Sequence, residues 1–423
     1  MSALRYSEPW YTGYAFQGAV VLGIAPILLP IVAAANGGAA AAGTVVAFFY
    51  VGQLLAPLLG SVTDRTGLHR TVYLAGYGLL AVGLALFPLT GSLWFWLALA
   101  FLQGAGSAAT NTVAAMFIVE WKPKGEWDTR IGWLQTFYGA GQAVGLALAA
   151  VLQATPAVGL WVAAALMAPG VVLGALRLPA RHAHTPPAPE ERTREHRAHR
   201  KPRSPAALLH HYDSALHTAL IRFAGEWRSR FGLFVASWFL MMFGTWLVYN
   251  LYPLLMRNAY GIDAGTSSLY YAVAATLGVF AYAPSGSIGT RIGDDRVVLI
   301  GALMTLASVT GMTVLAFVHT PVNAWLVPVA FVLLPVAWSP LIVAGTALTA
   351  QLSVPQGIPE GEAVGIFNAT TAIASVLSAF AAGFIAHVAS YGIVLLLSAA
   401  TTAAGCLLFL PILRTGIAET KSA

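Results

Sequence analysis

Uncharged polar and aromatic side chains recur at helical spacing inside long apolar stretches, where they could recognise a small molecule through hydrogen bonds and ring contacts. Trp246, Tyr249, Asn250 and Pro253 share one helical face, at positions i, i+3, i+4 and i+7. Similar faces occur on four other stretches: Tyr14 and Gln17; Gln103, Ser107 and Asn111; Gln135, Tyr138 and Gln142; and Asn368, Thr371 and Ser375. In apolar surroundings such groups either bind a ligand or join neighbouring helices by hydrogen bonds. Both interpretations stay open, and the faces around Trp246 and Asn111 favour a ligand.

Carboxylates are absent from the middle of every apolar stretch. All 16 Asp and Glu residues lie in or beside the polar interruptions. Ionisable groups inside a membrane usually mark proton relays or sites for charged substrates. A strongly charged ligand is therefore not expected at mid-depth. Glu8, Glu120 and His387 stand at the ends of stretches and could carry a proton, and Glu8 is the leading candidate for proton coupling.

One basic pattern occurs in each half of the chain. It places glycine and arginine at equivalent positions: Gly60, Arg65, Gly67 and Arg70 in the first copy, and Gly286, Arg291, Gly293 and Arg296 in the second. Asp64 of the first copy corresponds to Thr290 of the second. A Pro-x-Gly-Glu turn also occurs twice, at residues 123–126 and 359–362. Two matches in the same order predict two equivalent halves.

The elements that must position these residues are membrane-spanning helices. With 58% hydrophobic residues, 9% charged residues and a mean hydropathy of +0.74, the chain cannot present an ordinary soluble surface. A helix needs about 20 mostly apolar residues to cross a bilayer. On that length we expect twelve spans: 11–35, 44–62, 72–90, 92–118, 131–153, 157–176, 231–256, 267–288, 297–318, 323–349, 364–388 and 391–412.

The distribution of basic residues predicts the orientation. With the amino terminus inside, every Lys and Arg except Arg257 falls on the inner side. Both termini are then cytoplasmic, and the expected location is a prokaryotic cytoplasmic membrane. The formal charge of +6 reflects this topology and contact with membrane lipids, so no nucleic-acid partner is expected.

The same pattern predicts the domain organisation. We expect a six-helix bundle over residues 1–177, an inner linker over 178–228, a second six-helix bundle over 229–413 and a short inner tail over 414–423. The linker should be disordered at first and then form an amphipathic helix on the inner membrane surface. Its histidines show no repeated ligand spacing, so neither a metal nor a cofactor is expected.

The hairpin pattern resembles the signature of the major facilitator superfamily, Gly-x-x-x-Asp-Arg-x-Gly-Arg-Arg/Lys. Gly60, Asp64, Arg65, Gly67 and Arg70 match it, and the span count and the long inner linker extend the resemblance over nearly the whole chain. The implied fold is an all-α polytopic membrane protein of twelve helices in two pseudo-symmetric bundles. In this family the first, fourth, seventh and tenth spans line the path.

Several positions depart from the family pattern. Thr290 replaces the second aspartate, Gln103 stands where proton-coupled drug exporters often have arginine, and the fifth span has no Gly-Pro pair. The resemblance implies that Asp64 holds the inner gate shut at the start of the eleventh span, where a carboxylate favours the positive helix end. Gly67 and Gly293 should adopt positive φ, and Gly60 and Gly286 should allow close helix approach.

Together these features predict a secondary transporter that works as a monomer, rather than an enzyme. The expected substrate is a neutral, zwitterionic or lipophilic small molecule, with export of a drug-like compound marginally favoured. Uptake or facilitated diffusion of a neutral metabolite is the alternative, followed by a membrane sensor or scaffold without transport. The candidate substrate-binding residues are Tyr14, Gln17, Gln103, Asn111, Gln135, Tyr138, Trp246, Tyr249, Asn250 and Asn368. No nucleotide-binding Gly-x-x-x-x-Gly-Lys-Ser/Thr motif supports ATP-driven transport.

Overall fold

The computed structural model describes residues 6–123, 126–178, 229–318, 323–358 and 360–419. Within these ranges every regular element is a helix. The predicted linker helix and disordered segment over 178–228 lie, except for residue 178, outside the described residues.

The amino-terminal half contains six spans built from nine helical elements. They are α1 (Trp10–Gly18), the π-helix η2 (Ala19–Ile24), α2 (Ala25–Gln53), α3 (Ala56–Thr66), α4 (His69–Leu86), the short η3 (Phe87–Leu89), α5 (Leu93–Trp121), α6 (Trp127–Leu152) and α7 (Pro156–Arg177). The backbone of α2 leaves helical geometry at Gly37 and Gly38, where Gly38 has φ 67° and ψ −168°. This break separates the first span from the second, so the chain turns where the sequence predicted a turn.

The carboxyl-terminal half repeats the arrangement. It comprises α10 (Arg230–Tyr249), α11 (Tyr252–Tyr260), α12 (Ala264–Ile292), α13 (Asp294–Phe317), α14 (Asn323–Ser353), the short η5 (Val354–Gln356), α15 (Glu360–Val388) and α16 (Tyr391–Glu419). α10 and α11 are two parts of one span, interrupted at Asn250 and Leu251 just before Pro253. Proline removes a backbone donor and so favours such an interruption.

Length and apolar composition identify nine candidate membrane segments among the described residues. The first of these, Trp10–Thr63, contains two spans, and α6 and α12 are not among the nine. These two helices carry glycines, amides, serines and tyrosines over much of their length. They also pack against each other between the halves, so their composition suits a partly polar interface rather than a lipid-facing surface.

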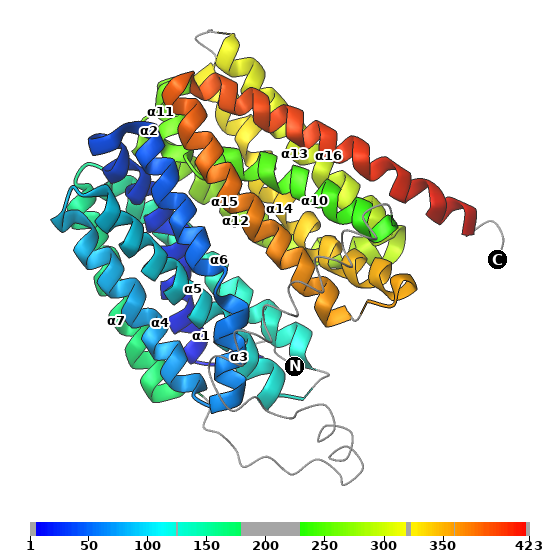
Figure 1. Cartoon of the computed structure of the whole chain (residues 1–423), viewed down its shortest axis with the longest axis horizontal. Helices are drawn as coiled ribbons and strands as arrows, with labels where there is room; N and C mark the ends of the chain where they lie inside the picture. Colours follow the sequence, from blue (N-terminus) through cyan, green and yellow to red (C-terminus); the bar gives the residue numbers. More distant parts are fainter. Residues whose placement is uncertain (1–5, 124–125, 179–228, 319–322, 359, 420–423) are drawn as a thin grey trace.

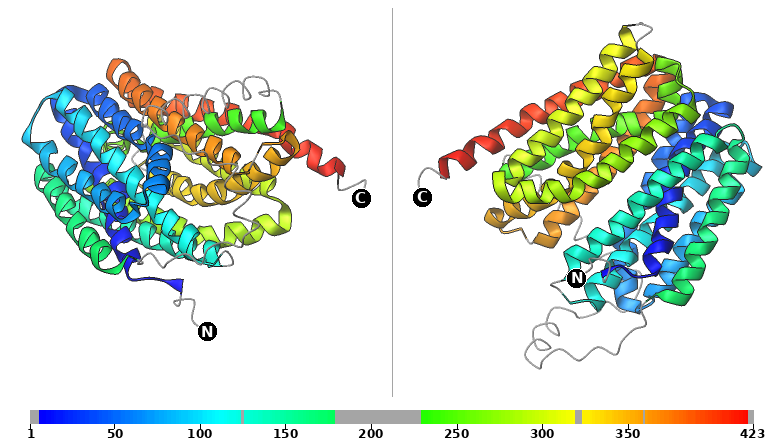
Figure 2. Two further views of the ribbon diagram at one scale, coloured as in Figure 1. Left: turned by 60° about the horizontal axis from the view of Figure 1, so that its bottom comes forward. Right: turned by 180° about the vertical axis from the view of Figure 1, so that it is seen from behind.

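The two halves meet at one end of the molecule and diverge at the other. We call the end with Gly67 and Gly293 the hairpin end, and the end with Gly38 and Gly261 the distal end. α2 packs along α15, and α6 packs along α12. Figure 1 shows α2, α11 and α15 together at the distal end, whereas α3 stands apart from the carboxyl-terminal half, and Figure 2 shows the same divergence from two further sides.

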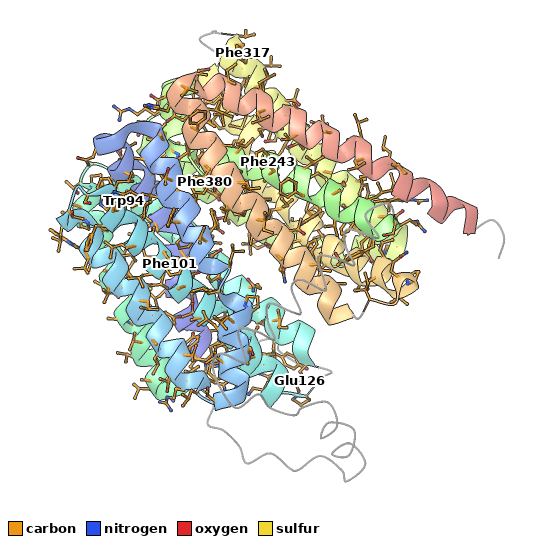
Figure 3. The ribbon with its side chains drawn as sticks, in the orientation of Figure 1. Trp94, Phe101, Glu126, Phe243, Phe317 and Phe380 are labelled. Atoms are coloured by element: carbon orange, nitrogen blue, oxygen red, sulfur yellow. The ribbon has the colours of Figure 1, made fainter. Side chains whose placement is uncertain are left out.

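Backbone contact joins the halves near the distal end. A methyl group added at Gly43 of α2 would lie 2.5 Å from the carbonyl oxygen of Ala379 and 2.6 Å from the Cα of Gly383, both in α15. The rings of Phe48 and Phe380 meet edge to face beside this crossing, with centroids 6.4 Å apart, and Figure 3 shows Phe380 between the two ribbons. Only hydrogen fits at Gly43, so this position sets how closely the halves can approach.

Equivalent tryptophans mark the distal membrane boundary. Trp94 is 80% exposed near the start of α5, and Trp325 is 77% exposed near the start of α14. α5 and α14 are the fourth span of their respective halves. Tryptophan favours the membrane–water interface, so this matched pair suits such a boundary at the distal end of both halves.

Candidate substrate site between the two halves

A hydrogen-bonded cluster forms the amino-terminal side of the interface. Asn111 of α5 accepts from the Tyr14 hydroxyl at 2.9 Å and from the Gln17 Nε2 at 2.7 Å, both from α1. Tyr138 of α6 is an electrostatic neighbour of Asn111, and Gln135 of α6 is one of Tyr14. We call these five residues the amide–tyrosine cluster. Five of the predicted binding residues are therefore brought together by three different spans.

Close contact between α1 and α6 positions this cluster. A methyl group at Gly141 would overlap the carbonyl oxygen of Ala15, so the two backbones touch. The contact places the ring of Tyr14 on that of Tyr138, with centroids 4.7 Å apart and planes tilted by 32°. The π-helix η2 begins at Ala19, two residues after Gln17. Such local widening of a helix often occurs at functional sites.

Aromatic rings form the carboxyl-terminal side. The ring of Trp246 lies 5.7 Å from that of Tyr249 and 5.7 Å from that of Trp338 of α14, measured between centroids. Tyr249 stacks on Tyr271 of α12 at 5.5 Å. We call Trp246, Tyr249, Tyr271 and Trp338 the aromatic wall. Its members offer flat apolar faces, and Trp246 adds an indole N–H.

Two further residues lie between the cluster and the wall. Tyr50 of α2 meets Trp246 edge to face, with centroids 5.4 Å apart. Gln142 of α6, the helix that carries Gln135 and Tyr138, is an electrostatic neighbour of Tyr271. Tyr50 is also an electrostatic neighbour of both Tyr138 and Tyr271. The cluster, the wall, Tyr50 and Gln142 therefore make one continuous uncharged surface between the halves, which we call the interface belt.

Three predicted binding residues lie away from this belt or at its margin. Gln103 is 1% exposed and contacts Gly83 of α4 inside the amino-terminal half. Asn250 donates to the Ser378 hydroxyl at 2.9 Å and to the Ser375 carbonyl at 3.3 Å, and so ties the seventh span to α15. Asn368 is exposed on α15, and no contact joins it to the described residues of the belt. Gln103 and Asn250 match the alternative interpretation, in which amides join helices.

Tyr50, Tyr271 and Trp338 belong to the belt but were not among the predicted residues. Tyr50 has no polar residue one helical turn before it, and Trp338 stands between two prolines, Pro335 and Pro340. Aromatic residues are common in membrane helices, so type and spacing alone did not distinguish these three. To identify them from the sequence, one would need to know that α2 packs against the carboxyl-terminal half.

Glu8 lies at the hairpin end, outside the belt. Its carboxylate accepts from Lys122 at 2.6 Å, from Arg130 at 2.8 Å and from the Trp10 indole at 3.0 Å. Arg130 also pairs with Glu126 at 2.8 Å, and Figure 3 shows Glu126 at this end of the bundle. The arrangement fastens the start of α1 to the connection between α5 and α6.

The two hairpins share a glycine turn but differ in their acidic groups. Gly67 has φ 69° and Gly293 has φ 94°, as predicted for these turns. A methyl group at Gly60 would lie 3.2 Å from the Thr112 side chain, which is close packing of α3 on α5. The basic residues Arg70, Arg291 and Arg296 are exposed at this end. The side chains of Asp64 and Arg65 and the surroundings of Gly286 lie outside the described residues.

In the second hairpin the carboxylate lies on the helix that follows the glycine turn, whereas Asp64 of the first hairpin lies on the helix that precedes it. Asp294 lies in the first turn of α13 and accepts from Gln351 of α14 at 2.7 Å. A carboxylate in the first turn stabilises the positive end of a helix. This contact remains within the carboxyl-terminal half, whereas Asp64 is expected to act between the halves.

No group of three or more His, Cys, Asp or Glu residues that could hold a metal occurs in the part of the chain that the structure describes. The histidine-rich segment predicted to be metal-free lies outside that part. Cys406, the single cysteine, is buried in α16.

Comparisons with known proteins agree with this architecture. The family model described as Major Facilitator Superfamily matches residues 11–360 and 239–423. A point mutant of the nucleoside transporter NupG superposes with a TM-score of 0.74 at 14% identity, over 95% of this chain and 98% of the other. The D-xylose-proton symporter gives 0.66 at 14% identity, over 95% of both chains, and a POT family transporter in complex with a conjugated peptide gives 0.68 at 14% identity, over 96% and 95%.

No curated protein sequence matches the chain. At 14% identity the structural neighbours show the fold alone, and their titles name different substrates. The family match, in contrast, covers nearly all twelve spans. The chain therefore belongs to the Major Facilitator Superfamily and is a secondary transporter rather than an enzyme.

Proposed function

We propose that this transporter moves an uncharged small molecule with an aromatic or other flat apolar surface and a few hydrogen-bonding groups. The observation that carries the proposal is the composition of the interface belt. Its members come from both halves and offer rings, phenols and amides, with no Lys, Arg, Asp or Glu among them. A charged substrate would be desolvated there without a counter-charge, which is costly. A neutral compound would keep its apolar contacts and hydrogen bonds.

The arrangement of the halves supports alternating access. They are packed along α2–α15 and α6–α12 and diverge toward the hairpin end (Figure 1). We propose that the hairpin end is cytoplasmic, because Lys and Arg concentrate there in the positive-inside pattern. On this assignment the structure is a state that faces the cytoplasm, and both termini are cytoplasmic.

Export is the direction that we propose. A lipophilic aromatic compound crosses a bilayer without help, so a carrier benefits the cell by moving it outward against its gradient. Uptake of a neutral polar metabolite is the second candidate, favoured by the amide–tyrosine cluster. The hydrogen bonds of Tyr14 and Gln17 to Asn111 show how that side could hold hydroxyl or amide groups.

The role of Glu8 bears on proton coupling, for which it is the leading candidate from the sequence. Its three donors, Lys122, Arg130 and Trp10, join the start of α1 to the connection between α5 and α6, which suits an anchor better than a carrier. We therefore propose that the Glu8 carboxylate fastens the helices, and that any coupling proton binds elsewhere. Transport driven by a pH gradient should then survive Glu8→Gln in whatever fraction folds. If Glu8→Gln abolished the response to the pH gradient while the substrate still equilibrated across the membrane, Glu8 would be the coupling residue.

Counterflow in proteoliposomes tests the proposed substrate class. Vesicles loaded with an unlabelled compound would be assayed against a labelled panel of neutral aromatic compounds, neutral sugars, aromatic cations and aromatic carboxylates, with and without an imposed pH gradient. Exchange of neutral aromatics that is reduced by Trp246→Ala supports the proposal. Selective exchange of a charged group would overturn it, and exchange of sugars alone would favour the second candidate.

A sensor or scaffold without transport predicts a different result. Deletion of residues 180–204 would then abolish the cellular effect, whereas flux would be undetectable in both the full chain and the deletion. Robust flux in the deleted chain would exclude this class.

A further inference from the structure

Buried polar atoms without a partner are informative because a folded protein usually pairs such atoms. Two of those among the described residues lie on the interface belt: the Gln17 Oε1 and the Trp246 Nε1. The others lie elsewhere, on Tyr11 beside Arg130, Gln103 against Gly83, Arg230 near Ile412, Asn250 beside Ser378, and Ser308 and Thr402 within the carboxyl-terminal half. The belt therefore contains one unpaired group from each half.

The free group of Gln17 is an acceptor. Gln17 is fully buried, at 0% exposure, and its Nε2 donates to the Asn111 Oδ1. The same oxygen of Asn111 accepts from the Tyr14 hydroxyl. The Asn111 Nδ2 donates to the Ser107 Oγ at 3.5 Å, which directs the Oδ1 toward Gln17. With Asn111 in this orientation, a Gln17 amide turned over would bring two acceptor oxygens face to face. The Oε1 is then the atom that lacks a donor.

The free group of Trp246 is a donor. An indole nitrogen can only donate a hydrogen bond. Around it stand the rings of Tyr50, Tyr249 and Trp338, whose centroids lie 5.4–5.7 Å from that of Trp246. These rings supply flat apolar contact but leave the N–H without an acceptor in the described structure.

We propose that the substrate is a planar, uncharged molecule that carries both a hydrogen-bond donor, directed to the Gln17 Oε1, and a hydrogen-bond acceptor, directed to the Trp246 Nε1. Phenolic ketones have this chemistry, with the hydroxyl and the carbonyl at opposite ends of a flat ring. The inference rests on the proposed function and sharpens it, because it makes Gln17 and Trp246 residues that determine specificity. It also links the two halves, since one molecule satisfies an atom of each.

The pattern implies discrimination against compounds that lack either group. A binding site that leaves its own polar atom unpaired rejects the deficient ligand far more strongly than a purely apolar pocket rejects a missing methylene. Because Gln17 is covered in this structure, the side chains around it must move apart when the ligand binds. The Gln17 contact is then made only in the fully bound complex.

Binding to the purified full-length protein in nanodiscs tests the pattern, with equilibrium dialysis at pH 6.5 as the measurement. One probe series is 4-hydroxyacetophenone, 4-methoxyacetophenone without the donor, and 4-ethylphenol without the acceptor. A second is 6-hydroxy-1-tetralone and its 6-methoxy derivative, which lacks the donor. We expect at least one parent compound to bind about tenfold or more tightly than its deficient analogues.

Two variants assign the groups. Gln17→Leu should abolish the preference for 4-hydroxyacetophenone over its methoxy analogue, and Trp246→Phe, which keeps a ring, should abolish the preference over 4-ethylphenol. Gln103→Leu, which alters a buried amide outside the belt, should leave both preferences unchanged. Circular dichroism and a monodisperse elution profile would establish that each variant is folded.

The outcomes separate this inference from the proposed function. Equal binding of parents and analogues, or no binding of any probe, overturns the donor–acceptor pattern. The proposed function stands in that case if neutral aromatics still exchange in proteoliposomes and Trp246→Ala reduces the exchange. Preferences that persist in Gln17→Leu and Trp246→Phe also overturn the assignment.

Discussion

The two halves share a scaffold but present different chemistry to each other. The amino-terminal half offers the amide–tyrosine cluster, in which Asn111 accepts from Tyr14 and Gln17. The carboxyl-terminal half offers the aromatic wall around Trp246. The two duplicated halves therefore have similar backbones, but the side chains that meet between them differ in chemistry. One half is suited to polar recognition and the other to apolar contact.

The halves also differ in how their helices begin. Ser229 caps α10 by accepting from the Gly232 N–H, and Asp263 caps α12 by accepting from the Thr266 N–H. Helices α1 to α7 of the other half show no side-chain cap among the described residues. A cap is worth about 1 kcal/mol, so the carboxyl-terminal half has local stabilisation that its counterpart lacks.

The largest effect is expected from separating the halves at their closest contact. Gly43→Val would push a side chain into the backbone of α15, where an added methyl already lies 2.5 Å from the Ala379 oxygen. Because that contact cannot form without a shift, transport should fall about tenfold or more. Proteoliposome flux is the measurement.

A matched control isolates the contact. Gly78→Val introduces the same side chain where nothing lies within 4 Å, and it should preserve flux. In a Cys406→Ser background, a cysteine replacing Phe48 should react with an impermeant maleimide from the distal side only when Gly43→Val is present. Unaltered flux and labelling in Gly43→Val would show that the halves do not close there.

The aromatic side of the comparison is tested by Trp246→Ala. Loss of the indole removes a flat face that the aromatic wall offers to the ligand, and it should weaken ligand binding by up to about tenfold, since an aromatic pair contributes about 0.5–1.5 kcal/mol beyond its area. Binding would be followed by equilibrium dialysis, and thermal unfolding would report the fold. Undiminished affinity would remove Trp246 from the site.

The polar side is tested by Asn111→Leu. Tyr14 and Gln17 both lose their acceptor, and each unpaired group costs about 1–3 kcal/mol, which should lower the unfolding temperature as well as the affinity. Asn111→Gln keeps an uncharged amide at this position and should preserve more of the affinity. If both substitutions had the same effect, hydrogen bonding at this position would not explain the role of Asn111.

The hairpins provide a smaller test of the asymmetry. Asp64→Asn should reduce flux several-fold and favour the state that is open at the hairpin end, if Asp64 stabilises closure there as its family position implies. Thr290→Asp at the equivalent position should have little effect, because Asp294 already serves the second hairpin through Gln351. Cysteine accessibility at the hairpin end is the measurement. A larger effect of Thr290→Asp would reverse the assignment.

The smallest effect concerns the cap of α12. Hydrogen bonds from the Thr266 side chain and backbone lower the pKa of Asp263, so its stabilising contribution is present at neutral pH and decreases as the pH falls through the lowered value. Asp263→Ala should cost about 1 kcal/mol at pH 7, and the difference from the natural protein should shrink below about pH 4. Thermal unfolding over this pH range checks it. A difference that is independent of pH would contradict a role for the charge.

Local patterns were sufficient to predict the helices and to select the polar residues that the structure brings together on the amino-terminal side of the interface. The breaks near Gly37 and before Pro253, and the positive φ of Gly67 and Gly293, follow from residues whose backbone preferences are strong. Tyr14, Gln17, Asn111, Gln135 and Tyr138 were found because amides and phenols are rare in apolar helices. Gln103 and Asn250 have the same residue types but face neighbouring helices of their own half. Spacing along one helix cannot tell these directions apart.

The sequence by itself determined that the protein lies in a membrane, how many spans it has, that its two halves are duplicated and which family it belongs to. Hydropathy, charge bias and the glycine–arginine hairpins are local properties, so they do not depend on how the helices pack. Only the tertiary structure decided which faces meet. It brought Tyr50 to Trp246, joined the halves through Gly43 and Gly383, and left Gln17 and Trp246 each with an unpaired atom. Those contacts join residues far apart in the chain, and their geometry depends on how two bundles pack rather than on any single helix.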